Sequence, residues 1–283
     1  MKREHKYILI GGLFLLTIAG SLLLWWFLVV SKRTEIVFLN VGQGDAILIS
    51  QGSSQVLIDA GKNGKDLLSH LGRYVPFWDR HIEFVIATHP DADHIGGFPS
   101  LLRSYTVDRV LTSGATSDTE VSKLFASATE KYSVEKSERI FRGTTLEFPS
   151  GGVLKIEYPL LPTDTVGGDT NASSVVARFE YGETSFLLTG DLPREETVLP
   201  EEQAVTVLKA AHHGSKYSTS ANFLDLVLPK EAIISVGKNT YGHPDMGVLD
   251  RLRERGVIIR RTDTDGDIRY RCIDSLSCRF VPY

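Results

Sequence analysis

The spacing of apolar and polar positions after residue 34 predicts a sheet-rich domain with helices between its strands. Three short apolar or alternating runs come first, separated by glycine-containing turns, and they predict a β-meander: TEIVFLNV, DAILIS and QVLIDAG. Helical spacing follows at 64–74, 98–105, 120–131, 222–227 and 246–255, with strand-like runs between these stretches. Because no linker rich in Pro, Gly or Ser divides residues 34–283, we expect one α/β domain.

Three hairpins are predicted in the second half of the domain. One joins SVVARFEY to TSFLLTGD around Gly182, and another joins VIIRRTD to DIRYRC around Asp265-Gly266. The last surrounds IDSLS and brings Cys272 near Cys278, which leaves open a disulfide or two unpaired thiols.

The N-terminal segment has a different pattern, because no charged residue occurs from Tyr7 to Val30. A helix of these 24 residues would reach ~36 Å, enough for a hydrocarbon core of about 30 Å. Trp25 and Trp26 stand near its end, where aromatic rings favour the membrane interface. Residues 1–33 are therefore expected to form a transmembrane signal anchor that contacts the membrane through residues 7–30. A cleaved signal peptide is the alternative.

Charge predicts the orientation of this segment. Lys2, Arg3 and Lys6 precede the apolar run, whereas only Lys32 and Arg33 follow it. The positive-inside rule then predicts a single-pass cell-membrane protein whose domain of residues 34–283 lies outside the cytoplasm. Residues 34–283 carry 26 basic and 34 acidic residues, a net charge of −8 that argues against a general nucleic-acid-binding surface.

Polar residues follow four of the predicted strands. Asp59, His89, Asp191 and His212 each come directly after an apolar run. Loops at strand ends are held by a rigid scaffold, so these four side chains can converge at one edge of a sheet.

The segment HPDADHIGG has the highest density of potential metal ligands in the chain. His89, Asp91, Asp93 and His94 supply four potential metal ligands within six residues. Imidazole nitrogens and carboxylate oxygens are common ligands of divalent cations. The glycines that follow let the backbone turn into the next helix. The pattern predicts a metal site.

HPDADHIGG, together with LIDAG, LLTGD and AAHHGS, resembles the motif series of the metallo-β-lactamase superfamily. FLNVGQGDAILI, NASSVV, LKAAHHGSKYSTS, YGHPD and RRTDTDGDI further resemble the C-terminal hydrolase domain of the ComEC branch, which is associated with degrading the DNA strand that is not imported. The resemblance implies an αββα sandwich, here preceded by one transmembrane helix. Asn40 stands where this branch usually has Asp, and a single apolar span implies hydrolysis without a transport channel.

The resemblance also implies a ligand set for two divalent ions. His89 and Asp91 would hold one ion, Asp191 would bridge both, and a hydroxide between the ions would be the nucleophile. The second ion would be held by Asp93, His94 and His212. Between His212 and His213 the resemblance leaves a choice, and we favour His212 because it comes first after the strand.

The first metal site departs from the usual family pattern. No histidine occurs between His94 and Asp191, where Asn171 and Ser174 lie instead. That site is then short of a ligand or uses an oxygen donor. Oxygen-rich ligation favours manganese over zinc.

Further residues are expected to act on the nucleophile or on the substrate. By resemblance, Asp59 orients a ligand or the metal-bound water, and His243 protonates a leaving group or contacts a phosphate. The candidate catalytic residues are Asp59, Asp93 and His243. The candidate substrate-binding residues are Asn171, His213, Ser215 and Lys216. Ser218 and Ser220 could serve the same purpose or cap the next helix.

These features predict a phosphodiesterase or nuclease that acts on extracytoplasmic DNA. A hydrolase of small esters or amides, such as a lactone or a β-lactam, is the alternative on the same scaffold. A non-catalytic binding module is a third possibility. Fold alone does not choose among them.

Overall fold

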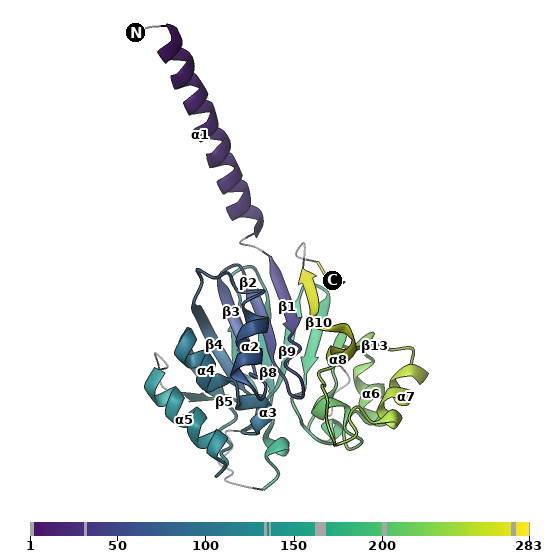
Figure 1. The fold of residues 1–283 in the computed structure, drawn as a ribbon. Coiled ribbons are helices and arrows are strands. Elements are labelled where there is room, and N and C mark those ends of the chain that lie inside the picture. Colours follow the sequence, from purple (N-terminus) through teal and green to yellow (C-terminus); the bar gives the residue numbers. More distant parts are fainter. Residues whose placement is uncertain are drawn as a thin grey trace.

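The computed structural model describes residues 3–30, 33–132, 135, 137–161, 168–199, 203–272 and 276–282. Two β-sheets face each other and are covered by helices on their outer sides (Figure 1). This arrangement confirms the predicted α/β fold class and its helix–sheet–sheet–helix layering.

The first sheet contains eight strands in the described part of the chain. In spatial order they are β15 (Cys278–Val281), β14 (Ile268–Cys272), β1 (Thr34–Phe38), β2 (Ile47–Gln51), β3 (Ser54–Ile58), β4 (His81–Ala87), β5 (Thr106–Thr112) and β6 (Glu138–Arg139). Strands β1, β2 and β3 pair antiparallel, as the predicted meander requires. From β3 to β6 the pairing is parallel.

The second sheet contains seven strands among the described residues. In spatial order they are β13 (Ile258–Arg261), β12 (Glu231–Ile234), β11 (Val207–Lys209), β10 (Thr184–Leu188), β9 (Val176–Tyr181), β8 (Val153–Tyr158) and β7 (Thr145–Glu147). Strands β9 and β10 form the predicted hairpin around Gly182. Strands β10 to β13 run parallel.

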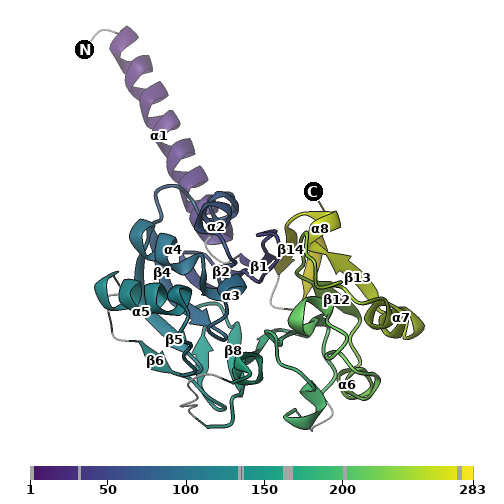
Figure 2. The same ribbon diagram turned by 60° about the horizontal axis from the view of Figure 1, so that its bottom comes forward.

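Helices pack on both outer faces (Figure 2). The first sheet is covered by α2 (Gly64–Leu71), α4 (Phe98–Ser104) and α5 (Glu120–Tyr132), with the short α3 (Ala92–Ile95) below them. The second is covered by α6 (Ala221–Val227) and α7 (Met246–Glu254). Separate buried clusters fill the three interfaces, so each sheet buries apolar side chains on both faces. Such strands are nearly continuous in hydrophobicity.

The topology brings the carboxyl ends of four parallel strands to one edge of the sandwich. Strands β3 and β4 pair in parallel in one sheet, and β10 and β11 do so in the other. The loops that leave these ends meet beside α3, where ligands of open α/β sheets are commonly bound.

The predicted hairpin around Asp265-Gly266 is wrong. Strand β13 stays in the second sheet beside β12, whereas β14 crosses to the first sheet and pairs with β1. A helical turn, α8 (Thr262–Asp265), separates the two strands, and Gly266 adopts a φ of 73° and a ψ of −145° that redirects the chain. The segment therefore connects the two sheets.

The C-terminal hairpin of β14 and β15 does form. Cys272 lies opposite Cys278 in the antiparallel register, and the two are joined by a disulfide. This settles the alternatives that the sequence left open. The first three residues of the intervening IDSLS turn lie outside the described residues.

The N-terminal segment is helical, as α1 (Arg3–Val30), and extends away from both sheets (Figure 1). Within the described part of the chain, however, no helix has the length and apolar content needed to cross a membrane. The predicted transmembrane anchor and the extracytoplasmic single-pass localisation are therefore corrected. Lys2 and Lys32, used for the orientation, lie outside the described residues.

The buried carboxyl group of Glu195 connects the segment after β10 to the segment after β11. Glu195 is fully buried and accepts hydrogen bonds from the Thr219 backbone N–H at 2.9 and 3.0 Å. Arg251 donates to the Thr219 carbonyl at 3.1 Å. Burial raises the pKa of Glu195 to about 7, although the hydrogen bonds from Thr219 act in the opposite direction.

This raised pKa predicts a stability that falls as pH increases. The folded protein favours the neutral carboxyl of Glu195, whose pKa in the unfolded chain is 4.5. The stability that this neutral carboxyl contributes is therefore fully present below pH 4.5 and is lost as pH rises through about 7. The loss is on the order of 3 kcal/mol. Urea unfolding at pH 5 and pH 8 should show this decline in the wild type and a smaller one in Glu195→Gln. The exposed Glu254→Gln serves as control, and an equal decline in all three proteins contradicts the assignment.

Candidate metal centre

The candidate site gathers side chains from both sheets at the edge described above. Asp59 follows β3 and His89 follows β4, while Asp191 follows β10 and His213 lies beyond β11. His94 lies on α3 together with Asp93. The convergence of strand ends that the sequence predicted is therefore present.

Three overlapping groups of side chains place their ligand atoms within 4.8 Å of one another. They are His89, His94 and Asp191; Asp93, His94 and His213; and Asp45, Asp59 and His94. Because His94 belongs to all three and Asp191 lies between His89 and His213, the groups form one continuous cluster.

His94 is held by contacts at both ring nitrogens. Its Nδ1 lies 2.7 Å from Asp59 Oδ2, and its Nε2 lies 3.3 Å from Asp191 Oδ2. Asp59 in turn accepts hydrogen bonds from the Thr88 backbone N–H at 2.8 Å and from the Thr88 hydroxyl at 2.7 Å. A carboxylate on one ring nitrogen fixes the tautomer and aims the other nitrogen, as in many metal sites.

The cluster fits a divalent cation. The Nε2 atoms of His89, His94 and His213 are buried and make no hydrogen bond, and neither does Asp191 Oδ1. Unsatisfied buried polar atoms are costly unless something coordinates them. Nitrogen and carboxylate donors that converge without mutual hydrogen bonds are the donor set of a metal site.

Neighbouring charges perturb the ionisation of these groups. Burial lowers the pKa of His94 and His213, but the nearby carboxylates, Asp191 foremost, outweigh it and raise that of His213 to about 9. Burial raises the pKa of Asp191, yet the same two imidazoles hold it well below its usual range. Protons on the rings therefore balance the buried carboxylates, and a bound cation would take over that role as the protons leave.

The structure places His213 rather than His212 in the cluster. The His213 side chain is 1% exposed, and its Nε2 lies 3.4 Å from both Asp93 Oδ2 and Asp191 Oδ2. Its Nδ1 lies 2.8 Å from the Ser235 carbonyl, which fixes the ring. The His212 side chain is 28% exposed and its Nε2 is 3.9 Å from Asp191. The geometry therefore favours His213 as the ligand, opposite to the preference drawn from sequence order.

The first metal site is built differently around Asp91. Asp91 lies outside the three groups, with its Oδ2 3.8 Å from His89 Nε2 and its Oδ1 accepting from the Thr170 hydroxyl at 2.5 Å. Asn171 has a buried Oδ1 without a hydrogen bond to the described residues. The Ser174 hydroxyl lies 3.3 Å from His89 Nδ1 and accepts from the Asp191 backbone N–H at 3.1 Å. The Ser174 hydroxyl therefore contacts the ring nitrogen opposite the unpaired Nε2, and the Asp91 carboxylate is the oxygen donor on the Nε2 side.

Two charged residues of the site were missed from the sequence. Lys209 and Asp45 are both buried and form an ion pair. Lys209 Nζ also donates to the Gly190 carbonyl at 2.8 Å and lies 3.6 Å from Asp191 Oδ1. Asp45 Oδ1 lies 3.5 Å from His213 Nδ1. Both residues stand in the motifs FLNVGQGDAILI and LKAAHHGS, but no pattern of polarity signals that a strand lysine is turned inward.

Close backbone approach positions these groups. Gly44 has a φ of +130°, and a Cβ there would come within 2.2 Å of the Asp93 carbonyl oxygen. The adjacent Asp45 N–H donates to that carbonyl at 3.2 Å. Asp59, His212 and His213 also adopt positive φ values, between 50° and 58°. Non-glycine residues rarely do so, and such strain is concentrated at functional sites.

A cavity of ≈ 530 Å³ opens over the cluster and contains several predicted substrate-binding residues. Ser215, Lys216 and His243 line it, together with Asp91 and Asp93. Ser218 and Ser220 are used structurally instead. Ser218 donates to the Ala211 carbonyl at 2.8 Å, and Ser220 accepts from the Phe223 N–H at the start of α6.

A sequence comparison identifies the family. Residues 39–238 match the profile of the metallo-β-lactamase superfamily. The chain belongs to this superfamily. The matched segment contains the HPDADH cluster, Asp191 and His213, so the predicted family and the geometry of the cluster agree.

Within the superfamily the chain is ComEC-like. It is 33% identical to ComE operon protein 3 of Bacillus subtilis, over 95% of the chain and 37% of that protein. It is 30% identical to Recombination protein 2 of Haemophilus influenzae, over 84% of the chain and 29% of that protein. The chain thus spans about a third of the length of these relatives.

Solved structures support the fold alone. The metallo-β-lactamase fold protein YhfI from Bacillus subtilis superposes with a TM-score of 0.56 at 14% identity, over 83% of the chain and 99% of that protein. CmlA, a diiron β-hydroxylase from Streptomyces venezuelae, gives 0.53 at 12% identity, over 89% and 54%. Since a protein named as a β-hydroxylase shares this fold, the reaction of this chain has to be inferred from its site.

The Asp45–Lys209 pair predicts a large stability effect. Lys209→Met leaves Asp45 buried without its cation, which should lower the free energy of unfolding by about 3–5 kcal/mol. The double variant Asp45→Asn/Lys209→Met should recover most of the loss. Urea unfolding of the metal-free protein measures both. Lys155→Met breaks an exposed pair with Glu180 and should cost less than about 1 kcal/mol. A Lys209→Met cost no larger than this control contradicts the prediction.

Proposed function

We propose that the chain is a metal-dependent phosphodiesterase that acts on DNA. The observation that carries the proposal is the lining of the cavity over the cluster. Lys216 supplies a cation, Ser215 a hydroxyl and His243 an imidazole, the groups that bind a phosphodiester. Two relatives named as competence or recombination proteins support DNA as the substrate.

Two divalent ions would be held by the cluster. His89 and Asp91 belong to the first ion, with Asp191 between the two sites. The second would be held by Asp93, His94 and His213, whose ligand atoms lie within 4.8 Å of one another. When bound, the ions would provide a nucleophile at neutral pH by lowering the pKa of water. The Asp91 carboxylate beside His89 Nε2, rather than a further histidine, favours manganese over zinc.

Asp59 and His243 act beside this cluster. Asp59 holds the His94 ring through Nδ1 and so aims Nε2 at the ion. The His243 ring lies 5.3 Å from that of His212 and belongs to none of the ligand groups, so it acts on the substrate. Burial and the neighbouring imidazoles of His212 and His213 lower the pKa of His243. A neutral ring still donates one N–H, which suits contact with a phosphate oxygen.

Assay of the protein after metal removal tests the function. Manganese should restore hydrolysis of single-stranded DNA and of bis-p-nitrophenyl phosphate more fully than zinc. A β-lactam and a lactone, offered in parallel, should remain intact. If only the β-lactam or the lactone is hydrolysed, the result supports a hydrolase of small esters or amides. If no substrate is hydrolysed with any ion, it supports a non-catalytic binding module. Full activity with zinc and none with manganese contradicts the metal preference.

Single substitutions should separate metal ligands from substrate contacts. Asp191→Ala and His213→Ala should lose bound metal and hydrolysis together, while His212→Ala and His243→Ala should keep their metal content. Loss of a hydrogen bond to a charged phosphate in His243→Ala should slow hydrolysis by roughly 10–100-fold.

Metal analysis and paired kinetics provide the measurement. Because we assign His243 to the phosphate, DNA and p-nitrophenyl substrates should slow by similar factors. A much larger effect on DNA would show that His243 protonates the leaving group, since p-nitrophenolate needs no proton. Metal loss in His243→Ala, or its retention in His213→Ala, would reverse the ligand assignment.

A further inference from the structure

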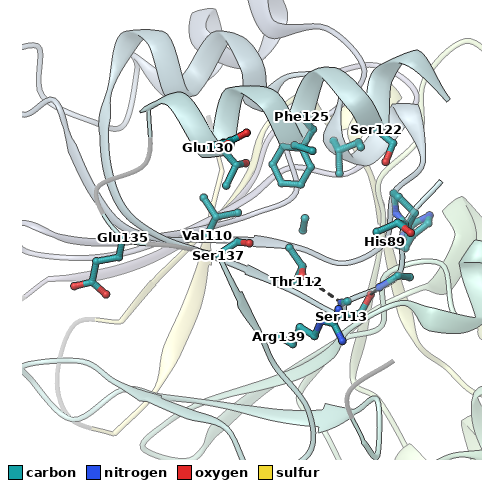
Figure 3. Close-up of a pocket in the computed structure, with 18 residues that line it drawn as sticks. His89, Val110, Thr112, Ser113, Ser122, Phe125, Glu130, Glu135, Ser137 and Arg139 are labelled. Atoms are coloured by element: carbon teal, nitrogen blue, oxygen red, sulfur yellow. Dashed lines mark hydrogen bonds between the residues drawn. The ribbon is translucent and has the colours of Figure 1, made fainter. Parts of the chain in front are cut away.

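A second cavity, of ≈ 680 Å³, adjoins the metal centre. Figure 3 shows it between α5, which carries Phe125 and Ser122, and the ends of β5 and β6, which carry Thr112 and Arg139. His89 closes one end of this cavity (Figure 3). His89 is also in the ligand cluster, so one side chain belongs both to the metal centre and to the wall of this cavity. The volume falls within the range of small-molecule sites.

The wall of the cavity combines apolar surface with hydroxyl groups. The Phe125 ring lies in the lining, supported from behind by stacking on Phe98 at 5.2 Å. Hydroxyls of Thr112, Ser113 and Ser122 accept only long hydrogen bonds, of 3.2–3.4 Å, from nearby backbone N–H groups. Each hydroxyl keeps its own proton to donate, and each can also accept.

Among the residues that the structure describes, one lining hydroxyl has no hydrogen-bond partner. Thr129 is 9% exposed, and its Oγ1 is buried without a hydrogen bond. An unsatisfied buried hydroxyl destabilises the protein by about 1–3 kcal/mol, and valine would fill the same volume without this penalty. A ligand with polar atoms would give this hydroxyl a partner, whereas a plain acyl chain would not.

We propose that this cavity binds the nucleobase next to the phosphodiester that is hydrolysed at the metal centre. The proposal rests on the proposed phosphodiesterase function. A base is a flat ring that packs against Phe125 and carries donors and acceptors on its edge. Hydroxyls that both donate and accept suit any of the bases, so the cavity would favour nucleotides over simple phosphodiesters without strict sequence preference.

Two substrates with one leaving group test the proposal. Thymidine 5′-(p-nitrophenyl phosphate) carries a base, whereas methyl p-nitrophenyl phosphate does not. Ala126 is an exposed lining residue of α5, so Ala126→Phe should fill the cavity and raise KM for the thymidine substrate about tenfold or more. Its KM for the methyl substrate should stay within about twofold. Ser127→Phe adds the same ring at the next exposed position, which does not line the cavity, and should change neither value.

Thr129→Val separates binding from folding. It should raise KM for the thymidine substrate about three- to tenfold while thermal stability stays equal or increases. A variant that slows both substrates equally, or neither, overturns the inference while the phosphodiesterase function stands. If the metal-loaded wild type hydrolyses neither substrate, the proposed function fails and the inference fails with it.

Discussion

The buried carboxylate of Asp191 is the constraint around which the two sheets are assembled. It lies at the carboxyl end of β10, between Lys209 from the neighbouring strand and the imidazoles of His94 and His213. A carboxylate in this position would be prohibitively costly if it were alone. Lys209 reaches it from the second sheet, whereas His94 reaches it from the first, so the charge requires both halves of the sandwich to be in place.

Asp45 extends the same constraint to the N-terminal meander. Its ion pair with Lys209 and its backbone contact with Asp93 connect the loop after β1 to both sheets. Buried ion pairs contribute little net stability, because desolvation offsets much of their attraction. Here the ion pair mainly fixes positions. Lys209 also donates a hydrogen bond to the Gly190 carbonyl and thereby holds the loop that carries Asp191.

Sequence patterns predicted the parts of this site that depend on local order. The ends of the predicted strands and the clustering of potential metal ligands were enough to predict His89, Asp93, His94 and Asp191 as site residues. The distinction between His212 and His213 could not be found in this way, because both adopt left-handed φ values and strand alternation no longer indicates which side chain points inward. The prediction of a hairpin after β13 failed for a related reason. The dipeptide Asp265-Gly266 is typical of a hairpin turn. The strands on either side nevertheless pair in different sheets, and this pairing is decided by tertiary packing rather than by local sequence.

The absence of a histidine between His94 and Asp191 changes what the site can recognise as well as what it can hold. Thr170 and Ser174 occupy that stretch and engage Asp91 and His89 through hydroxyl oxygens. The cavity lined by Phe125 begins at this same His89. The proposed first metal site and the proposed nucleobase site both involve His89, so the two proposals together predict that metal preference and substrate preference are linked in this chain.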